Sequence, residues 1–577
     1  MAYIQSLGGF VKQALESALQ CAVDTLLQDM PDAKAVRVQL TRPKIKEHGD
    51  YAANAAMPLA SALGMNPRQV AERLLQTVQW PEVVDSADIA GPGFINIKLK
   101  AGGETDILKT IMQQGAAYGR VDNDNGERVN LEFVSANPTG PMHVGHGRGA
   151  VVGDALANLL LARGYQVHKE YYINDAGNQI GVLANSVWLR MQELQGLNIT
   201  FPESAYPGDY IIDIAKGILA EQDFSAFECM DDDARLKAIG ELSVAANMAM
   251  IKADLQAMGI AFDEYFSEKT LHESGKVLEL IEKLEADDLI YTGTLPPPKG
   301  KEVSDYKPVE QRLFRTTQFG DDVDRPLQKQ DGTATYFAAD IAYHANKYER
   351  GFKHMIDIWG ADHGGYIKRV QSAMKALTGL DKQPEVLLVQ MVNLTRNGVP
   401  FKMSKRAGTF VALSEVVEEV GSDAVRFNFM TRRIESQFDF DLEAAKAKDA
   451  ENPVYYVQYA HARVCAVLRK AVSEGVEIMN IDDVDTSLLI SDEEQKLIKM
   501  LLSYPELLQT AAERREPYRI ATYTMQLAAA FHSFYHKHRV IGVEHDLMQS
   551  RLLLLKGTAQ VIKNGLALLG VSAPDEM

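Results

Sequence analysis

A strand–helix–strand pattern early in the chain restricts the fold more than any other feature. Arg128 to Val134 is typical of a buried strand, apolar residues recur at helical spacing over 146–163, and Val167 to Ile173 is typical of a second strand. Two strands joined by a helix of this length indicate a parallel βαβ unit. Such a unit is half of a doubly wound, Rossmann-like α/β fold, which binds nucleotides at the carboxyl ends of its strands.

The other half of this fold is expected further along the chain. His354 to Trp359 and Val386 to Leu394 predict two more strands, and Tyr366 to Leu377 predicts the helix that joins them. Between the halves lies a long segment, 178–330, in which we expect a largely helical insertion. We therefore assign 126–410 to one doubly wound α/β domain.

Different patterns flank this domain on both sides. Residues 1–115 predict a small α+β domain, with a helix over Phe10 to Gln28 and alternating strand positions from Val36 to Leu40. Two helices are expected within 411–452. From 453 to 577 long segments carry apolar residues at helical spacing, which predicts an all-α bundle.

Two short segments carry the chemistry. His143 to His146 reads His-Val-Gly-His and opens the helix of the βαβ unit, where unpaired N–H groups and the helix dipole suit a phosphate. Two imidazoles there can bind phosphate oxygens, and a glycine between them lets a flat base approach the backbone. Lys402 to Arg406 reads Lys-Met-Ser-Lys-Arg in a loop after a strand, and its lysines can stabilise charge on the other side of a triphosphate.

These segments resemble the HIGH and KMSKS motifs of class I aminoacyl-tRNA synthetases. Four longer runs are similar specifically to the arginyl-tRNA synthetases, and they are Leu131 to His146, Tyr171 to Gln179, Tyr336 to Asp340 and Asn452 to His461. The resemblance covers nearly the whole chain. It implies ATP-dependent activation of L-arginine to arginyl adenylate, followed by transfer to the 3′ end of tRNA(Arg) with release of AMP and pyrophosphate.

The resemblance also implies an architecture. The doubly wound domain is then a HUP-type class I catalytic domain with its helical insertion. The domain at 1–115 contacts the D-loop corner of tRNA, the helices within 411–452 contact its stem, and the bundle at 453–577 binds the anticodon. Such enzymes need tRNA before they activate the amino acid.

The nucleotide ligands follow from the motifs. His143 and His146 are expected to contact the ATP phosphates, and a side chain at Gly145 would strike the adenine. Lys402 and Lys405 are expected to stabilise the pyrophosphate leaving group. The alternative for the histidines is two satisfied side chains at a helix start.

Two further parts of the nucleotide site are expected. Ser404 completes the lysine loop, in which Arg406 replaces the family's last serine with little expected effect. Gly360 and Asp362 lie at the carboxyl end of a predicted strand and resemble the ribose-binding stretch of the class. Asp362 has an alternative role as the cap of the following helix.

Arginine as a substrate requires carboxylates, because the guanidinium is a charged fork of five donors. The resemblance implies Glu132 and Asp340 for this end, with Tyr336 beside them, and Ser135 and Asn137 for the α-amino and carboxylate ends. Asp340 could instead be a surface residue of a helix. Glu132 is harder to explain in an apolar strand, because a charge there normally needs a partner.

No protein nucleophile or general base is needed, because positioning and charge stabilisation can carry both steps. Mg²⁺ is expected to arrive with ATP instead of occupying a protein-built site. Three separated cysteines without a Cys-x-x-Cys pair predict no structural zinc and no disulfide framework. An editing site is not expected.

Aromatic and amide side chains are the candidates for RNA contact. Phe94 and Asn96 could stack on and bind an unpaired base, although Phe94 could be core and Asn96 could face water. Tyr455, Tyr456 and Tyr459 could stack anticodon bases, with half-buried core positions as the alternative. The net charge of −18 argues mildly against nucleic acid, but net charge does not fix the potential of a local groove. We expect tRNA and no DNA as a partner.

Location and competing functions complete the predictions. No apolar run reaches the roughly 20 residues that cross a bilayer, and the first residues lack a secretory pattern, so a cytoplasmic location without membrane contact is expected. We also expect a monomer. The competing functions are another nucleotidyltransferase of this fold, a non-catalytic RNA-binding relative, and a class I synthetase for another amino acid. The long insertion and the terminal bundle argue against another nucleotidyltransferase. The intact motifs argue against a non-catalytic relative, and the arginyl-like runs argue against a synthetase for another amino acid.

Overall fold

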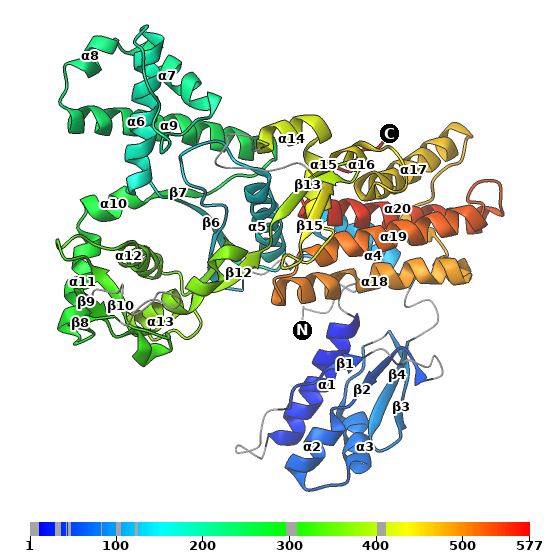
Figure 1. The fold of residues 1–577 in the computed structure, drawn as a ribbon. Helices are drawn as coiled ribbons and strands as arrows, with labels where there is room; N and C mark the ends of the chain where they lie inside the picture. Colours follow the sequence, from blue (N-terminus) through cyan, green and yellow to red (C-terminus); the bar gives the residue numbers. More distant parts are fainter. Residues whose placement is uncertain are drawn as a thin grey trace.

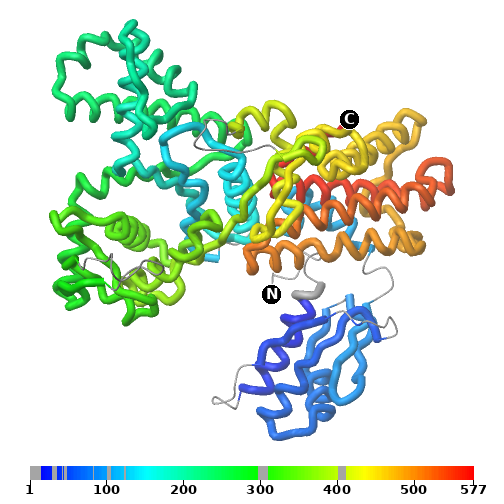
Figure 2. Tube along the Cα trace, viewed as in Figure 1, coloured from blue at the N-terminus to red at the C-terminus, as the bar shows by residue number. Residues whose placement is uncertain are grey.

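The computed structural model describes residues 11–28, 36–41, 43, 48–81, 83–99, 105–121, 125–295, 309–400 and 411–577. The lysine segment from Lys402 to Arg406 lies outside these described residues, and with it the predicted roles of Lys402, Ser404 and Lys405. Figures 1 and 2 show a central sheet that connects a helical insertion, a mixed α/β lobe and a long helical bundle. No helix in the described part of the chain is long and apolar enough to span a membrane.

A five-stranded parallel sheet forms the centre, as the βαβ pattern predicts. Its order is β12 (Glu385–Val389), β11 (His354–Gly360), β5 (Arg128–Glu132), β6 (Gln166–Ile173) and β7 (Glu264–Ser267). Helix α5 (Val144–Ala162) crosses from β5 to β6, and α13 (Ile367–Thr378) crosses from β11 to β12. The doubly wound fold class is confirmed.

Gly153 allows α5 to lie close to this sheet. A Cβ atom at Gly153 would lie only 2.2 Å from the ring of Phe133, the residue that follows β5. A larger residue in the helix would therefore push α5 away from the strand ends that it helps to organise.

The apolar run from Val386 to Leu394 does not form the single strand that was predicted. It is divided between β12 and β13 (Val392–Arg396), and β13 belongs to a separate sheet with β14 (Val399–Pro400) and β15 (Phe438–Asp441). The break lies at Gln390, whose backbone N–H donates to Ile434 and whose carbonyl accepts from Arg148. These bonds take Gln390 out of the ladder, a change that an apolar pattern alone does not reveal.

The segment 178–330 contains short strands as well as helices. Four helices form the insertion at the top of Figure 1, namely α6 (Asn178–Leu194), α7 (Asp209–Glu221), α8 (Phe224–Glu228) and α9 (Asp232–Ala257). Beyond them the helix predicted around Glu273 to Asp288 also forms, but the segment contains strands that were not predicted, and β7 joins the central sheet. Strands of four or five residues are too short for period-two alternation to stand out.

The rest of that segment contributes to the mixed α/β lobe. Its elements are α10 (Glu268–Glu273), α11 (Lys276–Ala286), β8 (Ile290–Thr294), β9 (Glu310–Phe314) and β10 (Arg325–Gln328), followed by α12 (Tyr336–Glu349). The three strands form an antiparallel sheet in the order β10-β9-β8. Helices α10 and α11 pack on α12, so the lobe supports the helix that carries Tyr336 and Asp340.

The N-terminal domain has its own core and projects from the rest of the molecule, which it meets at a pocket lined by residues of both parts, among them Leu40 and Glu513 (Figure 2). Its helices are α1 (Val11–Leu27), α2 (Ala56–Leu63) and α3 (Pro67–Thr77), and its sheet has the order β1 (Leu40–Thr41), β2 (Tyr51–Ala53), β4 (Phe94–Leu99) and β3 (Val84–Ala90). The strand expected from Val36 to Leu40 is formed only at its end. Val36 and Val38 are buried without strand pairing.

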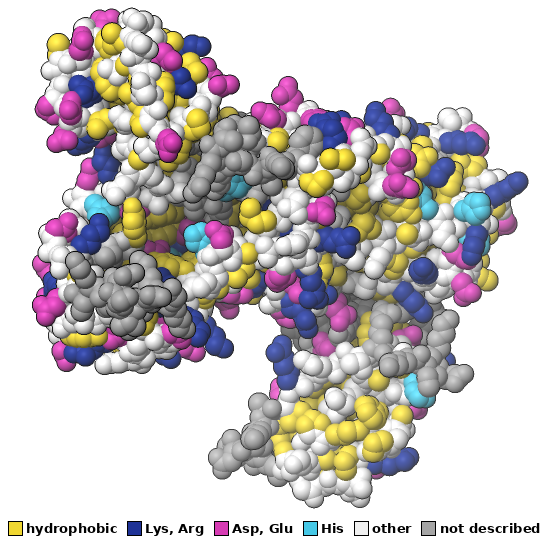
Figure 3. Space-filling view, viewed as in Figure 1, with side chains coloured by type: hydrophobic (Ala, Val, Ile, Leu, Met, Phe, Trp, Pro, Cys, Tyr) yellow, Lys and Arg dark blue, Asp and Glu magenta, His cyan; other side chains and the backbone are white. Residues whose placement is uncertain are grey.

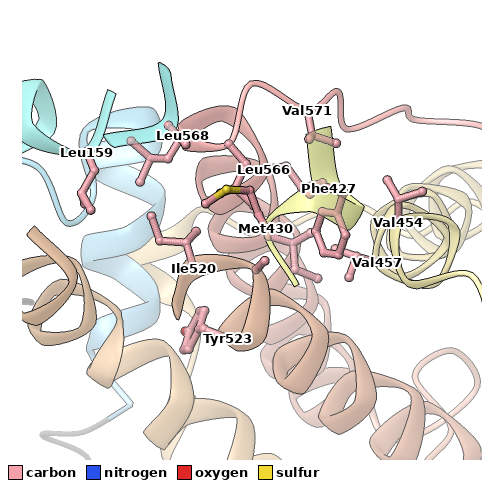
Figure 4. Packing of buried hydrophobic residues seen from close by; sticks show 14 of the residues in the cluster. Leu159, Phe427, Met430, Val454, Val457, Ile520, Tyr523, Leu566, Leu568 and Val571 are labelled. Atoms are coloured by element: carbon pink, nitrogen blue, oxygen red, sulfur yellow. The ribbon is translucent and has the colours of Figure 1, made fainter. Parts of the chain in front are cut away.

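The C-terminal bundle shares one core with helix α5 of the central sheet. It consists of α17 (Pro453–Ser473), α18 (Asp492–Glu513), α19 (Tyr518–Lys537) and α20 (His545–Leu568), with α4 (Ile107–Gln114) packed on α20. Between sheet and bundle lie α14 (Leu413–Val420), α15 (Ser422–Phe429) and α16 (Leu442–Lys446). Figure 4 shows Leu159 of α5, Phe427 of α15, Ile520 and Leu566 in the same buried cluster.

Candidate active site

The two histidines form a compact pair at the start of α5. His143 is the residue before the helix, its backbone N–H donates to Nδ1 of His146 at 3.3 Å, and the two rings stack at 3.6 Å. A Cβ atom at Gly145 would lie 2.9 Å from Cε1 of His143. The first requirement for glycine here is therefore the packing of the His143 ring.

The histidine turn is tied to the residues that follow the lysine segment. The N–H of Leu413 donates to the carbonyl of Met142 at 2.8 Å, and His143 pairs with Ala412 in an isolated bridge. Positions far apart in sequence thus meet at the start of α5. This contact places Ala412 and Leu413 beside the histidine turn.

Gly360 and Asp362 lie at the same edge of the sheet as the histidine turn. Gly360 ends β11, which is the neighbour of β5, and parallel strands end at the same edge. The Asp362 side chain is 77% exposed and lies 3.5 Å from His363. An exposed carboxylate at this edge is placed to meet a ligand that enters from solvent.

A row of carboxylates runs across the sheet beside this edge. The strand register places Asp357 of β11 opposite Glu132 of β5, Glu132 opposite Glu170 of β6, and Glu170 opposite Glu264 of β7. Partners in register share one face of a sheet. The first three are buried, so the row needs cations.

Helix α12 supplies those cations. Lys347, fully buried, donates to Glu132 at 2.6 Å and to Asp357 at 3.0 Å. His344 lies one turn earlier and contacts Asp357 at 2.8 Å. Sequence reasoning did not identify these cations, because the partners of Lys347 lie on other elements.

The row continues to the far strands in the same way. Arg350, just after α12, donates to Glu170 at 2.9 Å and to Glu264 at 2.6 Å. The hydroxyl of Tyr343 donates to Glu170 at 2.6 Å. Each carboxylate of the row is therefore paired.

Titration behaviour follows from this pairing. Burial alone would lower the pKa of Lys347, but the carboxylates of Asp357 and Glu132 raise it above its ordinary value. Burial likewise opposes a charge on His344, yet Asp340 and Asp357 raise the pKa of His344 to about 10. Burial would raise the pKa of Asp357, but Lys347 and His344 hold it below its usual range. Lys347 and His344 are thus cationic at neutral pH.

A strained turn follows Glu132. Val134 and Ser135 have φ values of 69° and 39°, which side chains rarely adopt and which are least favourable for a β-branched residue. The hydroxyl of Ser135 donates to Glu132 at 2.8 Å and accepts from the N–H of Tyr172 at 3.1 Å. Glu132 thus has the partners that its apolar strand required, and the exposed Asn137 follows two residues after the turn.

A second group of carboxylates lies near the turn, where one oxygen of Asp340 lies 3.4 Å from the ring of buried His344. One carboxylate oxygen of Asp340 is buried and accepts no hydrogen bond from the described part of the chain. Burial raises the pKa of the Tyr172 phenol, and the neighbouring charges of Glu268 and Asp340 raise it further. Glu268 is itself buried, which raises its pKa. The sequence analysis missed Glu268, whose only signal was a carboxylate directly after a strand.

Tyr336 lies on the same face of α12 as Asp340. It precedes Asp340 by one turn of α12 and is 62% exposed. Its ring lies against Gly177 of the Tyr171 to Gln179 run, where an added Cβ atom would be 3.6 Å from the ring. Figure 3 shows this face of the molecule hollowed between the α6–α9 insertion and the α10–α13 lobe, with hydrophobic and histidine side chains in the hollow.

The predicted RNA-contacting residues lie at the two ends of the molecule. Phe94 is 39% exposed and is not part of the core, while Asn96 is half-buried on the same face of β4. Tyr455 and Tyr459 stack at 5.9 Å, and Tyr456 lies 4.8 Å from the ring of His532. All three tyrosines are half-buried, and Tyr456 packs against the hydrophobic core, as the alternative held for it.

A hollow beside Tyr459 continues this surface. It has a volume of about 430 Å³ and is lined by Arg463, Lys470, Tyr535 and Met577, among others. The guanidinium of Arg463 lies 5.1 Å from the ring of Tyr459 and 4.8 Å from that of Tyr535. Stacked rings beside cations form a surface suited to unpaired bases.

Comparisons with known proteins agree along the chain. Residues 10–99 match the family described as "Arginyl tRNA synthetase N terminal domain", 107–201 match "tRNA synthetases class I (R), catalytic domain", and 457–577 match "DALR anticodon binding domain". The arginine--tRNA ligase of Magnetococcus marinus is 47% identical over 98% of this chain and 100% of its own length. That of Azorhizobium caulinodans is 46% identical over 96% and 98%, respectively.

The fold comparison gives the same result at lower identity. The arginyl-tRNA synthetase structure from Thermus thermophilus superposes with a TM-score of 0.71, covering 98% of this chain and 100% of that chain. Its sequence identity is 22%, so this likeness concerns the fold alone.

Proposed function

The chain belongs to the arginyl-tRNA synthetase family, and on this premise we propose how its residues join L-arginine to tRNA(Arg) with ATP. The observation that carries the proposal is the buried, open carboxylate oxygen of Asp340, beside Glu268 and near the edge where α5 begins. A guanidinium needs such acceptors, and an ATP phosphate needs such a helix start.

Arginine lies with its guanidinium between Asp340 and Glu268. The Tyr172 hydroxyl lies beside both carboxylates, and Tyr336 closes the solvent side. Ser135 and Asn137 bind the α-amino and carboxylate ends, because they follow β5 at the same edge of the sheet. A site built for five guanidinium hydrogen bonds rejects lysine, which lacks that fork.

ATP lies along the start of α5. His143 and His146 bind phosphate oxygens, Gly145 leaves the backbone open, and Gly360 with Asp362 binds the ribose. From the other side Lys402, Ser404 and Lys405 stabilise the β- and γ-phosphates. The carboxylates of the row across the sheet are already paired with Lys347, His344 and Arg350, and Mg²⁺ enters with the triphosphate.

The reaction has two balanced steps. A carboxylate oxygen of arginine attacks the α-phosphorus of ATP, an oxygen–phosphorus bond forms, and pyrophosphate leaves. The terminal ribose hydroxyl of tRNA then attacks the arginyl carbonyl, loses its proton and displaces AMP. Both steps proceed by positioning and charge stabilisation without a protein nucleophile.

Transfer RNA spans the molecule from the bundle to the N-terminal domain. Residues 453–577 bind the anticodon through Tyr455, Tyr456 and Tyr459, and the helices within 411–452 support the stem. Residues 1–115 meet the D-loop corner through Phe94 and Asn96. We further propose that the enzyme acts in the cytoplasm as a monomer and does not bind DNA.

One assay tests the function. The purified chain should attach radiolabelled arginine to bulk tRNA in the presence of ATP and Mg²⁺, and lysine should not replace arginine. Failure to charge any tRNA with arginine, by protein that is folded and binds ATP, would refute the proposal.

A further inference from the structure

We propose that Lys347 is a positioning residue for arginine: through Glu132 it fixes the strained turn at Val134 and Ser135 that receives the main-chain end of the amino acid. The inference rests on the proposed function, because it names what holds one part of that arginine site. It assigns Glu132 to the support of Ser135 and leaves the guanidinium to Asp340 and Glu268.

The first step is the position of Lys347 on α12. Tyr336, Asp340, His344 and Lys347 follow one another at intervals of three or four residues, so they share one face of the helix. Tyr336 and Asp340 are at the end that meets solvent, whereas Lys347 is fully buried against the carboxylate row. One helix face thus contacts both the open carboxylate of Asp340 and the turn after β5.

The second step is the need for an anchor at the turn. Consecutive positive φ values at Val134 and Ser135 persist only if surrounding contacts hold them. Two contacts converge on the Ser135 hydroxyl, which donates to Glu132 and accepts from the backbone of Tyr172. The contact from Tyr172 comes from its backbone, which the sheet holds in place. The Glu132 side chain is therefore the partner whose position depends on other side chains.

The third step is the fixation of Glu132. One of its oxygens accepts from Ser135 at 2.8 Å and the other accepts from Lys347 at 2.6 Å. Lys347 is held in turn by Asp357 at 3.0 Å. The ammonium therefore fixes the orientation of the carboxylate on which the Ser135 hydroxyl depends.

The fourth step separates two sets of carboxylates. Glu132, Asp357 and Glu170 are saturated by Lys347, His344 and Arg350, and they have no need of a substrate cation. Asp340 keeps one buried oxygen that accepts no hydrogen bond from the described residues. Loss of Lys347 should therefore disturb the main-chain end of arginine while the guanidinium end keeps its partners.

The test compares the binding of L-arginine with the binding of an analogue that has only the guanidinium end. L-Arginine has both ends, whereas n-butylguanidine has the guanidinium and an alkyl chain but no α-amino or carboxylate group. Arginine KM and ATP KM are measured by tRNA-dependent pyrophosphate exchange, and n-butylguanidine is measured as a competitive inhibitor against arginine. The variants are Lys347→Met combined with Glu132→Gln, which removes both charges together, and Glu132→Ala alone, which leaves Lys347 paired with Asp357.

Both variants should raise the arginine KM about tenfold or more, as expected for the loss of a charge-assisted contact. The ATP KM and the n-butylguanidine inhibition constant should stay within about twofold, less than 0.5 kcal/mol. Lys375→Met, which removes an exposed lysine from α13, is the matched control and should change none of the three values.

Two results would overturn the inference. Parallel losses of arginine and n-butylguanidine binding in Glu132→Ala would mean that Glu132 contacts the guanidinium directly. An unchanged arginine KM in that variant would mean that the turn needs no support from the Lys347–Glu132 pair. If the double variant does not fold, Glu132→Ala still decides, because its remaining charges are paired. Absence of arginine charging by the unmodified chain would instead refute the proposed function.

Discussion

The carboxylate of Asp254, on helix α9 of the insertion, accepts a hydrogen bond from the backbone N–H of Met142, the residue before His143. Its other oxygen is buried and accepts no hydrogen bond from the described part of the chain. Burial raises the pKa of Asp254 from 3.8 to about 6, although the Met142 bond opposes this shift. The insertion therefore places next to the histidine turn a carboxyl group whose charged form is disfavoured by burial.

Asp254→Asn should stabilise the protein at pH 8 and change it little at pH 4. A carboxyl group whose folded pKa is raised contributes stability that is present below about 3.8 and is lost as pH rises through about 6. An asparagine side chain can still accept the hydrogen bond from Met142 and carries no charge. The substitution should therefore raise the free energy of unfolding by about 1–3 kcal/mol at pH 8. Thermal unfolding at both pH values measures this, with exposed Asp213→Asn on α7 as the control. An equal shift at both pH values would contradict the assignment.

Asp340→Asn should weaken arginine binding strongly and leave ATP affinity nearly unchanged. The buried oxygen of Asp340 is the anionic partner proposed for the guanidinium, and losing such a partner costs about 2–5 kcal/mol when the pair is desolvated. Calorimetric titration with arginine and with an ATP analogue measures the two affinities. Arginine binding within about twofold of the unmodified protein would remove Asp340 from the site.

Glu268→Gln should show the same pattern with a smaller effect. Burial already raises the pKa of Glu268, so its charge is held less firmly than a solvated carboxylate, and glutamine keeps one acceptor oxygen. We expect a rise in arginine KM of about tenfold. Glu273→Gln, an exposed glutamate in the same helix, serves as the control. An equal effect in both variants would assign the loss to α10 as a whole.

Lys405→Ala should slow adenylate formation more than it weakens arginine binding. Lys405 belongs to the lysine segment, and the residues after that segment pair with the histidine turn. A cation that acts mainly on the leaving pyrophosphate should be worth roughly 100-fold or more in rate. Single-turnover adenylation with saturating substrates decides the point. A near-normal rate would show that the second lysine is dispensable.

The sequence predicts those candidate site residues that lie within one continuous run. The helix start at His143, the carboxylate in the strand at Glu132 and the helix face at Asp340 are all readable from local pattern. Lys347 could not be predicted in this way, because its partner Glu132 is 215 residues away in the sequence. The acidic row becomes visible only once the order of the strands is known. The single strand predicted over Val386 to Leu394 was wrong for the same reason, because the break at Gln390 depends on a contact with the distant Arg148.

The shared core also limits how the role of the bundle can be tested. Deletion of 454–577 would remove Ile520 and Leu566 from the cluster that contains Leu159 of α5 (Figure 4). Buried Arg426 of α15 would lose its bond to the carbonyl of Leu569 while it still contacts Asp154 of α5. We therefore expect the deletion to unfold the catalytic domain, so substitutions on the bundle surface are the better probe.

Arginine-dependent pyrophosphate exchange should be negligible without tRNA and should appear when tRNA is added. RNA that binds the bundle can favour the productive site only if it binds that state more tightly, and Arg426 provides a buried link between bundle and α5. Arg463→Ala removes the cation beside Tyr459 and Tyr535. It should raise the tRNA concentration for half-maximal exchange about tenfold, whereas the maximal rate should persist because the shared core stays intact. Lys496→Ala on α18 is the control. Robust exchange by full-length protein, stripped of RNA by nuclease and high salt, would show that the site assembles without tRNA.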